Sequence, residues 1–382
     1  MASIEHYASN ITVRQPASDN PCTVDWTSFL DRPLFALRSC DWSNCFAGKN
    51  VLITGAGGSI GSALSVRLMG GLARTLIFLD HSGHNLQGLY ERYKCRNVTL
   101  PQVEFIQADI LCQQSLEKVF SKYQPEIVFH TAAMKHLPAL ESEPFHALQN
   151  NLLGTIRLLQ VVDGADVECF VNVSTDKAVN PTSMLGVSKR LAELFLIAME
   201  SSTRKITLRL GNVLGSSGSV APLFLHCLRN GLPLAITDAQ ASRYFLTVEE
   251  ATDFLIAGSN IRRDSLLLPE MGRPRKIMEL ADFLRRESGR QGLDDGLTLV
   301  GLRDGEKRSE QLTYDYEFRR KTGVRHLDQI CGNSIDDPET FADNLGRLLE
   351  LVLHRQKDGV VELLMSLAPE FVPSRTLLHC LC

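Results

Sequence analysis

The sequence of 382 residues contains no long hydrophobic run, no excess of basic charge and no paired cysteine motif. No segment reaches the roughly 18 to 20 consecutive apolar residues of a membrane-spanning helix, and the N-terminus lacks the pattern of a signal peptide. We therefore expect a cytoplasmic protein without a membrane span. The formal net charge of -4, with no cluster of lysine and arginine, indicates small-molecule partners and no nucleic acid.

The ten cysteines are scattered along the chain, and only Cys380 and Cys382 are close in sequence. Without a Cys-x-x-Cys pair, the pattern indicates reduced thiols, as in the cytosol. No group of histidine, cysteine and acidic residues has the spacing of metal ligands, so we expect no metal.

From Lys49 onward, strand-like apolar runs alternate with helical patterns. This alternation is typical of βαβ units, so it predicts an α/β fold with a doubly wound parallel sheet. The expected strands lie at 51–54, 75–79, 103–106, 127–130, 169–173 and 206–209, and the expected helices include 62–69, 148–162 and 188–199.

These patterns divide the chain into four parts. Residues 1–47 are a polar arm and lead-in, and residues 48–215 form the dinucleotide-binding domain. Glycine and proline become frequent in 216–335, which we interpret as a smaller lobe on the substrate side. Apolar positions with helical spacing predict that 336–382 is a helical C-terminal appendage.

A glycine-rich turn follows the first strand, with the sequence Gly55-Ala56-Gly57-Gly58-Ser59-Ile60-Gly61. Its glycines permit a tight turn and let backbone N–H groups approach a pyrophosphate at the start of the next helix. Asp80 follows at the end of the next strand, where a carboxylate would bind an adenosine ribose hydroxyl. We therefore predict that this turn binds a dinucleotide; the alternative is a glycine-rich turn that binds no ligand. Asp80 favours NAD over NADP because it would repel a 2′-phosphate, although His81 would soften the repulsion.

The segment 171–190, VNVSTDKAVNPTSMLGVSKR, is the most informative about chemistry. The run 169–173 predicts a buried parallel strand, and hydroxyls and charges begin where it ends. Ligands bind at the carboxyl ends of strands in open α/β sheets, so Thr175, Asp176 and Lys177 are placed to touch a substrate. The alternative is a solvated loop with a capping hydroxyl.

Several longer runs carry a resemblance to a known family. They are TGAGGSIGS, FHTAAMKHLPALE, NNLLGT, STDKAVNPTSMLGVSKR, RLGNVLGSSGSVAPLF, SRYFLT and GLRDGEKRSEQL. Together they resemble the UDP-N-acetylglucosamine 4,6-dehydratases of polysaccharide biosynthesis, a group of extended short-chain dehydrogenases/reductases, over about residues 28 to 375. Residues 29–33 resemble the linker before the catalytic domain of the large membrane-anchored members, so the chain resembles their soluble catalytic half.

The resemblance implies a reaction on a UDP-sugar. In that family a tightly held NAD or NADP takes a hydride from sugar C4, water leaves across C5 and C6, and the hydride returns to C6. Asp176 would protonate the leaving C6 hydroxyl, which needs a carboxyl kept protonated in a shielded site. Lys177 would be the base at C5, which needs an amine whose pKa is lowered by burial or nearby positive charge. Lys189 would bind the nicotinamide ribose, Thr175 would bind the C4 oxygen, and Asn151 would organise the backbone.

The same resemblance implies further ligand contacts. Beyond the glycine turn, Asp80, His81 and Lys189, the cofactor-binding residues would be Asp109, Ile110, Ala132 and Ala133. Guanidinium groups suit a diphosphate, and the substrate-binding residues would be Lys135, Arg209, Asn212, Val220, Arg243, Arg303 and Glu306. Taken singly, an arginine is more often a surface charge, and the segment 215–219 either closes over a nucleotide or is a plain turn. The family also suggests a homodimer or a larger homo-oligomer.

The chain departs from the family pattern at two positions. Leu185 stands four residues before Lys189, where the superfamily has the tyrosine that removes the C4 hydroxyl proton. Leucine cannot transfer a proton, so the C4 base is unassigned among Lys177, Asp176 and Lys135. Asp304 replaces the usual proline in GLRDGEK, which puts substrate affinity in doubt.

Two alternatives remain open from the sequence. A UDP-sugar 4-epimerase would share the fold and the C4 oxidation, but it would not need the pair of Asp176 and Lys177. A non-catalytic sensor or scaffold that binds the dinucleotide would explain Leu185.

Overall fold

The computed structural model describes residues 24–38, 42–95, 101–289 and 296–381. Its centre is a nine-stranded sheet in the order β14-β15-β11-β6-β5-β4-β1-β2-β3. The seven neighbouring strands from β11 to β3 are parallel, whereas β15 and β14 are antiparallel to their neighbours. The strands are β1 Asn50–Thr54, β2 Thr75–Asp80, β3 Gln102–Gln107, β4 Ile127–His130, β5 Cys169–Thr175, β6 Arg204–Leu210, β11 Ser265–Pro269, β14 Phe318–Lys321 and β15 Leu327–Cys331. The predicted doubly wound α/β fold is confirmed.

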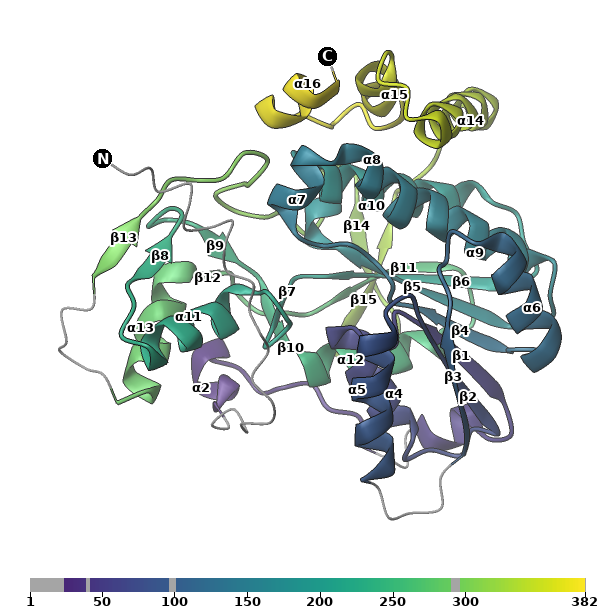
Figure 1. Ribbon diagram of the computed structural model, residues 1–382, viewed down its shortest axis with the longest axis horizontal. Coiled ribbons are helices and arrows are strands. Elements are labelled where there is room, and N and C mark those ends of the chain that lie inside the picture. The colour runs from purple at the N-terminus through teal and green to yellow at the C-terminus, as the bar shows by residue number, and fades with distance from the viewer. Residues whose placement is uncertain (1–23, 39–41, 96–100, 290–295, 382) are drawn as a thin grey trace.

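Helices cover both faces of this sheet (Figure 1). One face packs against α4 Ser59–Leu68, α5 Gly83–Lys94 and α12 Val248–Ser259, through Leu64, Leu89 and Phe254 among others. The other packs against α6 Gln113–Tyr123, α9 Gly154–Asp163 and α10 Met184–Ala198. Because both faces are buried, β1, β2 and β4 are buried along their whole length. This explains why apolar runs marked these strands in the sequence.

A smaller lobe lies beside the sheet, at the left of Figure 1. Its apolar core joins the helices α2, α11 and α13 through residues such as Phe29, Phe224 and Leu284. Its elements are α2 Trp26–Leu30, α11 Val220–Arg229, β8 Leu234–Ile236, β9 Ser242–Arg243, β12 Arg275–Lys276, α13 Ile277–Glu287 and β13 Leu297–Leu299. Two short parallel strands, β7 Asn212–Leu214 and β10 Phe245–Thr247, connect it with the large sheet.

The division of the chain at residue 215 differs from this arrangement in one respect. The strands β11, β14 and β15, and the helix α12, come from the segment assigned to the smaller lobe, yet they extend and cover the large sheet. The chain therefore leaves the sheet and returns to it. Frequent glycine and proline residues mark where the chain leaves the sheet, but they do not indicate that β11, β14 and β15 join it again.

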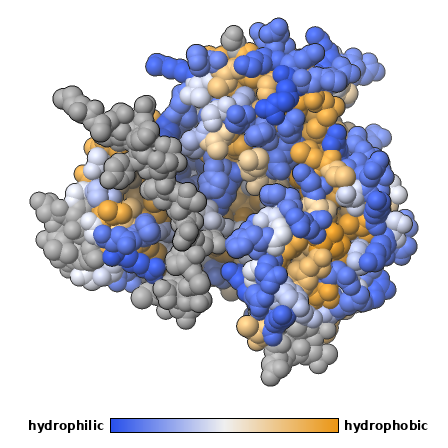
Figure 2. All heavy atoms as spheres, viewed as in Figure 1, coloured by the Kyte–Doolittle hydropathy of each residue, from blue (hydrophilic) through white to orange (hydrophobic). Residues whose placement is uncertain are grey.

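The C-terminal region is helical, with α14 Pro338–His354, α15 Val360–Leu367 and α16 Arg375–Leu381. These helices share a buried apolar cluster with α10 and with α7 Leu137–Ser142, α8 Pro144–Ala147 and the π-helical turn η2 Leu148–Leu153. They form the top layer of Figure 1, and the upper edge of the surface in Figure 2 is largely hydrophilic there. None of the helices in the described ranges is long and apolar enough to cross a membrane.

Three buried polar side chains, Thr54, His130 and Thr155, are hydrogen-bonded in a row inside the protein. The Nδ1 atom of His130 lies 2.8 Å from the Thr54 hydroxyl and its Nε2 atom lies 2.9 Å from the Thr155 hydroxyl. Burial, aided by the positive charge of Lys189, lowers the pKa of His130 from 6.5 to about 3. The folded protein therefore binds fewer protons than the unfolded chain between these two pH values, and stability is lost as the pH falls through that window.

We expect this histidine to steepen acid unfolding. Between pH 6.5 and 4 the free energy of unfolding of the wild type should fall by about 3 kcal/mol more than that of a His130→Gln variant. The variant should start lower at pH 7, because it loses the imidazole contacts. Urea titrations at a series of pH values measure both effects, and parallel pH profiles for the two proteins would contradict this role of His130.

Candidate active site

The strand β5 ends at Thr175, and the short 3-10 turn η3 Asp176–Ala178 follows it directly. The Thr175 hydroxyl accepts a hydrogen bond from the Lys177 backbone N–H at 3.4 Å and donates one to Asp176 Oδ1 at 3.0 Å. The Lys177 ammonium donates to Asp176 Oδ1 at 2.9 Å and to Asn212 Oδ1 at 3.0 Å. Four residues predicted from the sequence therefore form one polar cluster at the carboxyl end of a parallel strand, where ligands bind in such sheets.

A second carboxylate, missed in the sequence, completes this cluster. Glu310 Oε1 lies 3.8 Å from Lys177 Nζ and 3.9 Å from Arg243 Nε, and Glu310 Oε2 lies 2.8 Å from Lys307 Nζ. Glu310 is buried and belongs to the run GLRDGEKRSEQL, residues 301–312, far beyond Lys177 in the chain. The available signal was an acidic residue inside a run that had already been singled out, but its partner is visible only in the fold.

Burial and charge set the protonation of the central pair. Burial raises the pKa of Asp176, aided by the negative charge of Glu310 and opposed by Lys177. Burial alone would lower the pKa of Lys177, but Asp176 and Glu310 outweigh it and hold this pKa above its ordinary value. The raised pKa of the shielded Asp176 carboxyl agrees with its predicted role as an acid. The expected lowering of the Lys177 pKa is wrong for this arrangement, because two carboxylates face the amine.

The exposure of the pair indicates which group a ligand would meet first. The Lys177 side chain is 16% exposed, whereas the Asp176 side chain is 0% exposed. Asp176 Oδ2 is buried and makes no hydrogen bond within the described part of the chain. A ligand at the carboxyl end of β5 would therefore contact the amine of Lys177 first, and it would reach the carboxyl of Asp176 only after a side-chain shift.

The helix α10 carries Leu185 and Lys189 one turn apart, and both are buried. The Lys189 ammonium donates to the carbonyl oxygen of Val173 at 2.8 Å, which fixes it against the end of β5. Burial lowers the pKa of Lys189 to about 8, although Glu193 opposes the shift. The apolar Leu185 side chain contributes to the cluster that α10 shares with the C-terminal helices.

Asn151 lies in the π-helical turn η2 and is fully buried. Its Oδ1 accepts from the Met134 N–H at 2.8 Å, and its Nδ2 donates to the Met134 carbonyl at 2.9 Å. This double contact ties the helix to the loop after β4, which carries Ala132, Ala133 and Lys135. Single π-helical turns occur often at functional sites.

The glycine turn after β1 forms a cradle without side chains. Gly55 has a φ of 66°, and a Cβ there would lie 2.6 Å from the backbone of Ala132. A Cβ on Gly61 would lie 2.1 Å from the Gly55 carbonyl oxygen. The helix α4 begins at Ser59 after Gly58, which has no side-chain cap, so its first N–H groups suit a phosphate.

Asp80 joins this cradle at the end of β2. Its Oδ2 accepts from the Gly57 N–H at 3.0 Å and its Oδ1 accepts from the Ser82 N–H at 2.9 Å. His81 Nδ1 lies 3.4 Å from Asp80 Oδ1 on an exposed side chain. Ser59 and Ile60 are the first residues of α4. The start of this helix and the glycine turn would fit the pyrophosphate of a dinucleotide, and Asp80 would fit its adenosine ribose.

The predicted residues after β3 lie on the other side of β2. Asp109 is exposed, and its Oδ1 accepts from the Leu111 N–H at 2.9 Å. Ile110 is buried against Gly154, where a Cβ would meet Ile110 Cδ1 at 2.6 Å. Asp109 and Ile110 therefore shape the loop between β3 and α6.

Three predicted substrate-binding residues gather around the run GLRDGEK. Arg243 Nη2 lies 2.8 Å from Glu306 Oε1, and Glu306 Oε2 accepts from the Arg303 N–H at 3.3 Å. Arg243 also donates to the carbonyl oxygens of Ser242 and Arg308. Val220 is the first residue of α11.

The segment 215–219 lies over the start of α4. The Ser217 N–H donates to the Ser59 hydroxyl at 2.9 Å. A Cβ on Gly218, whose φ is 69°, would lie 2.3 Å from His136 Cε1. The segment therefore bridges the glycine cradle and the loop of Lys135, an exposed residue whose pKa is lowered by partial burial of its ammonium.

Arg209 does not join the candidate site, and we correct its predicted role. It is fully buried, with Nη2 2.8 Å from Glu193 Oε2 and Nη1 2.6 Å from Glu317 Oε2. Its Nε donates to Glu193 Oε1 at 3.0 Å, and Nη1 also contacts the Leu312 carbonyl. These partners occupy the guanidinium, so we drop Arg209 from the proposed substrate-binding residues.

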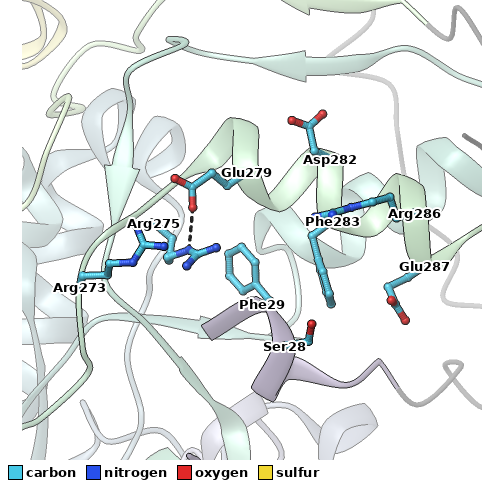
Figure 3. Close-up of a pocket in the computed structure, with 9 residues that line it drawn as sticks. All are labelled: Ser28, Phe29, Arg273, Arg275, Glu279, Asp282, Phe283, Arg286 and Glu287. Atoms are coloured by element: carbon cyan, nitrogen blue, oxygen red, sulfur yellow. Dashed lines mark ion pairs between the residues drawn. The ribbon is translucent and has the colours of Figure 1, made fainter. Parts of the chain in front are cut away.

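A polar cavity of about 380 Å³ lies in the smaller lobe between α2 and α13 (Figure 3). Arg275 Nε lies 2.7 Å from Glu279 Oε2 in its wall, and Arg275 stands over the ring of Phe29. None of the residues of the Asp176 cluster lines this cavity. Its lining therefore belongs to the packing of the smaller lobe, and the cluster at the end of β5 remains the candidate site.

The sequence profile of a family described as polysaccharide biosynthesis protein matches residues 51–331, which include the cradle, the cluster and the sheet. The chain belongs to this family. The assignment to the polysaccharide-biosynthesis group made from the sequence is confirmed. A relative in the group, the capsular polysaccharide biosynthesis protein CapD of Staphylococcus aureus, is 36% identical over 76% of this chain and 49% of its own length. The chain therefore spans about half the length of this relative.

Two further relatives of this chain are named for different activities. The UDP-glucose 4-epimerase of Rickettsia typhi is 29% identical over 70% of this chain and 78% of its own length. The UDP-N-acetylglucosamine 4,6-dehydratase (inverting) of Campylobacter jejuni is 28% identical over 76% of this chain and 88% of its own length. Among solved structures, Pen from Bacillus thuringiensis matches with a TM-score of 0.68 and 27% identity, over 76% of this chain and 89% of that chain.

Proposed function

We propose that this chain is a nucleotide-sugar 4,6-dehydratase that acts on UDP-N-acetylglucosamine with a tightly held NAD or NADP. The observation that carries the proposal is the contact of Lys177 with Asp176 at the end of β5, beside Thr175 and Asn212. The 28% identity to the Campylobacter jejuni dehydratase over most of both chains supports it. Elimination of water across C5 and C6 needs a base at C5 and an acid at the C6 oxygen, whereas epimerisation needs proton transfer only at the C4 hydroxyl.

The glycine cradle, Asp80 and Lys189 would hold the dinucleotide. When bound, this cofactor would supply the hydride acceptor for sugar C4 and the hydride donor for C6. Both Asp80 oxygens accept backbone N–H groups beside the cradle. A ribose hydroxyl would donate to the same carboxylate, whereas a 2′-phosphate would be repelled by its negative charge. We therefore favour NAD.

The contact of Lys177 with Asp176 also provides a route to the protonation states that elimination requires. Transfer of one proton from the Lys177 ammonium to the Asp176 carboxylate, across their 2.9 Å contact, leaves a neutral amine and a neutral acid. A bound sugar that excludes water from Lys177 would favour this neutral pair, because the two charged groups would lose solvation.

Elimination then returns the pair to its starting state. The Lys177 amine takes the proton from C5, the C6–O bond breaks, and Asp176 gives its proton to the departing hydroxyl as water. Lys177 ends as an ammonium and Asp176 as a carboxylate, so the protons of the elimination balance. The Lys177 ammonium would then give a proton back to C5, and the proton taken from the C4 hydroxyl would restore the ammonium for the next turnover. Thr175 would bind the C4 oxygen, while Arg243, Arg303 and Glu306 would hold the UDP side of the substrate. We propose that Lys177, Asp176 or Lys135 removes the C4 hydroxyl proton in place of the tyrosine that Leu185 replaces.

The experiment that tests this function is a product assay. The purified protein is incubated with UDP-N-acetylglucosamine, and the sugar is followed by mass spectrometry and NMR. A product that has lost one water supports the dehydratase. An unchanged mass with inversion at C4 would replace it with the 4-epimerase, which the Rickettsia typhi match supports. Bound dinucleotide without conversion of any UDP-sugar would favour the non-catalytic sensor or scaffold.

We further propose that the protein works in the cytoplasm as a homodimer or larger homo-oligomer. Light scattering of the purified protein measures the mass in solution, and the mass of a single chain would contradict the assembly.

A further inference from the structure

The C-terminal segment contacts three parts of the chain beside the candidate active site. The Val372 N–H donates to the Pro181 carbonyl at 3.0 Å, in the loop that follows Lys177. The Ser374 hydroxyl donates to Glu141 Oε2, and the Thr376 N–H donates to Asp304 Oδ2. The segment therefore meets the catalytic loop, the helix α7 and the run GLRDGEK together. We call this meeting point the C-terminal joint.

Glu141 is the buried centre of the C-terminal joint. It is 2% exposed, and its Oε1 accepts from the N–H of Met184, the first residue of α10, at 2.6 Å. The Ser374 hydroxyl that donates to Glu141 also accepts from the Leu377 N–H at 3.0 Å in α16. One carboxylate thus connects the start of the helix that carries Lys189 with the start of α16.

Gly305 fits tightly into the same place. The Thr182 hydroxyl donates to the Gly305 carbonyl at 3.0 Å. A Cβ on Gly305, whose φ is 75°, would lie 3.1 Å from the Thr182 carbonyl oxygen and 3.2 Å from Glu141 Cδ. The run GLRDGEK is therefore held against the catalytic loop on one side, and its Asp304 is held by α16 on the other.

The connection from the C-terminal joint to the active site is short. Two residues after Asp304, Glu306 contacts Arg243, and six residues after it, Glu310 lies 3.8 Å from Lys177 Nζ. Displacement of Asp304 would move the side chains that pair with the proposed UDP-binding arginine and with the catalytic amine. Within the described residues, 372–381 form no hydrogen bond or ion pair with Lys177, Arg243 or Glu310, so we infer that the segment acts through the position of the run.

We propose that the segment 372–381 is a positioning element of the active site, and that Asp304 is the positioning residue that couples it to the UDP-binding run. The proposal deepens the proposed function, on which its catalytic part rests. In the resembling family the position of Asp304 is usually proline, which has no carboxylate. The coupling therefore belongs to this chain's own residue at that position.

Amide hydrogen exchange of the full-length protein tests the coupling without any assumption about the reaction. In Asp304→Ala, exchange is expected to rise in residues 301–311 as well as in 372–381. Asp304→Asn should restore wild-type exchange, because its amide oxygen still accepts the Thr376 N–H. Ser374→Ala, which loosens the same segment from the Glu141 side, should also raise exchange in 301–311. Asp358→Ala is the matched control, since Asp358 is exposed in the same region. A rise confined to 372–381 in both alanine variants would overturn the proposal.

Kinetics connect the C-terminal joint to the active site. We expect Asp304→Ala to raise KM for the UDP-sugar and to weaken UDP binding by calorimetry, each about fivefold to tenfold, with kcat within about twofold. Asp304→Asn should recover most of the affinity. An equal loss of kcat and stability with unchanged UDP affinity would contradict positioning and indicate a merely structural contact. If the wild type neither binds UDP nor converts a UDP-sugar, the proposed function fails, while the exchange experiment still decides on the coupling.

Discussion

Replacement of Asp176 by asparagine is expected to lower kcat by about 10²- to 10⁴-fold, the usual range for a lost general acid. Asparagine has the same shape, and its Oδ1 can keep the contacts with Thr175 and Lys177. It cannot exchange a proton with the amine, so neither the neutral amine nor the acid would form. UDP binding should stay within a few-fold of the wild type, because Arg243 and Glu306 are untouched. Steady-state kinetics and calorimetry with UDP measure the two quantities.

Lys177→Met is the companion variant. It should lose activity to a similar extent and should also lose exchange of the C5 proton with solvent, because the base itself is gone. The two substitutions should not be additive, since each variant lacks the proton that the pair shares. A kcat for Asp176→Asn within tenfold of the wild type would assign the acid to another group, of which Glu310 is the nearest buried carboxyl in the cluster.

Replacement of Arg209 by methionine is expected to destabilise the fold by about 3–5 kcal/mol, because it removes the charge that pairs with two buried carboxylates. Glu317 loses its arginine partner, and Glu193 keeps only Arg190, whose Nη1 lies 3.5 Å from Glu193 Oε2. The Arg209 guanidinium lies between the two carboxylates with contacts of 2.8 Å and 2.6 Å. Glu193 also accepts from the Ser174 hydroxyl at 2.6 Å, so the network reaches the end of β5. The midpoint of urea unfolding measures the loss.

Two further variants separate this network from substrate binding. Glu193→Gln and Glu317→Gln together, added to Arg209→Met, should recover part of the lost stability, since they remove the two buried carboxylate charges. Arg320→Met is the matched control on the exposed strand β14 and should stay within about 0.5 kcal/mol of the wild type. An Arg209→Met protein with wild-type stability but poor UDP affinity would restore the role predicted from the sequence.

The large parallel sheet was predictable because its strands are local apolar runs. β1, β2 and β4 are buried on both faces. Consecutive residues in them are therefore mostly apolar, and this gives a continuous apolar run in the sequence. The glycine cradle was predictable for a similar reason, since Gly55 and Gly61 leave a pattern within one short run. Both signals depend on residues that are close in sequence.

The features that were missed depend on residues far apart in the chain. Arg209 is paired with Glu317 across 108 positions. Its place at the end of the expected strand 206–209 suggested contact with a ligand, but in the fold two carboxylates occupy the guanidinium. The role of Lys177 as a base needed a lowered pKa, but Asp176 and, from a distant run, Glu310 hold this pKa above its ordinary value. The return of β11 to the sheet likewise depends on its pairing with β6, which no local pattern specifies.

Asp304 is an intermediate case. Its departure from the resembling family was visible in the sequence, and we assigned it an effect on substrate affinity. The structure suggests a different cause for that effect. Asp304 accepts a hydrogen bond from the Thr376 N–H, so we expect it to act by holding the C-terminal segment and not by binding the nucleotide. The sequence marked the position, and the fold shows its partner.

The most direct test of the central claim is turnover of UDP-N-acetylglucosamine by the wild-type protein in deuterated water, followed by NMR and mass spectrometry of the sugar. The roles proposed for Asp176 and Lys177 predict a product that has lost one water and carries deuterium at C5, because the base exchanges with solvent once the C4 ketone has made this proton acidic. A converted sugar without loss of water, or a dehydrated product without deuterium at C5, would contradict these roles.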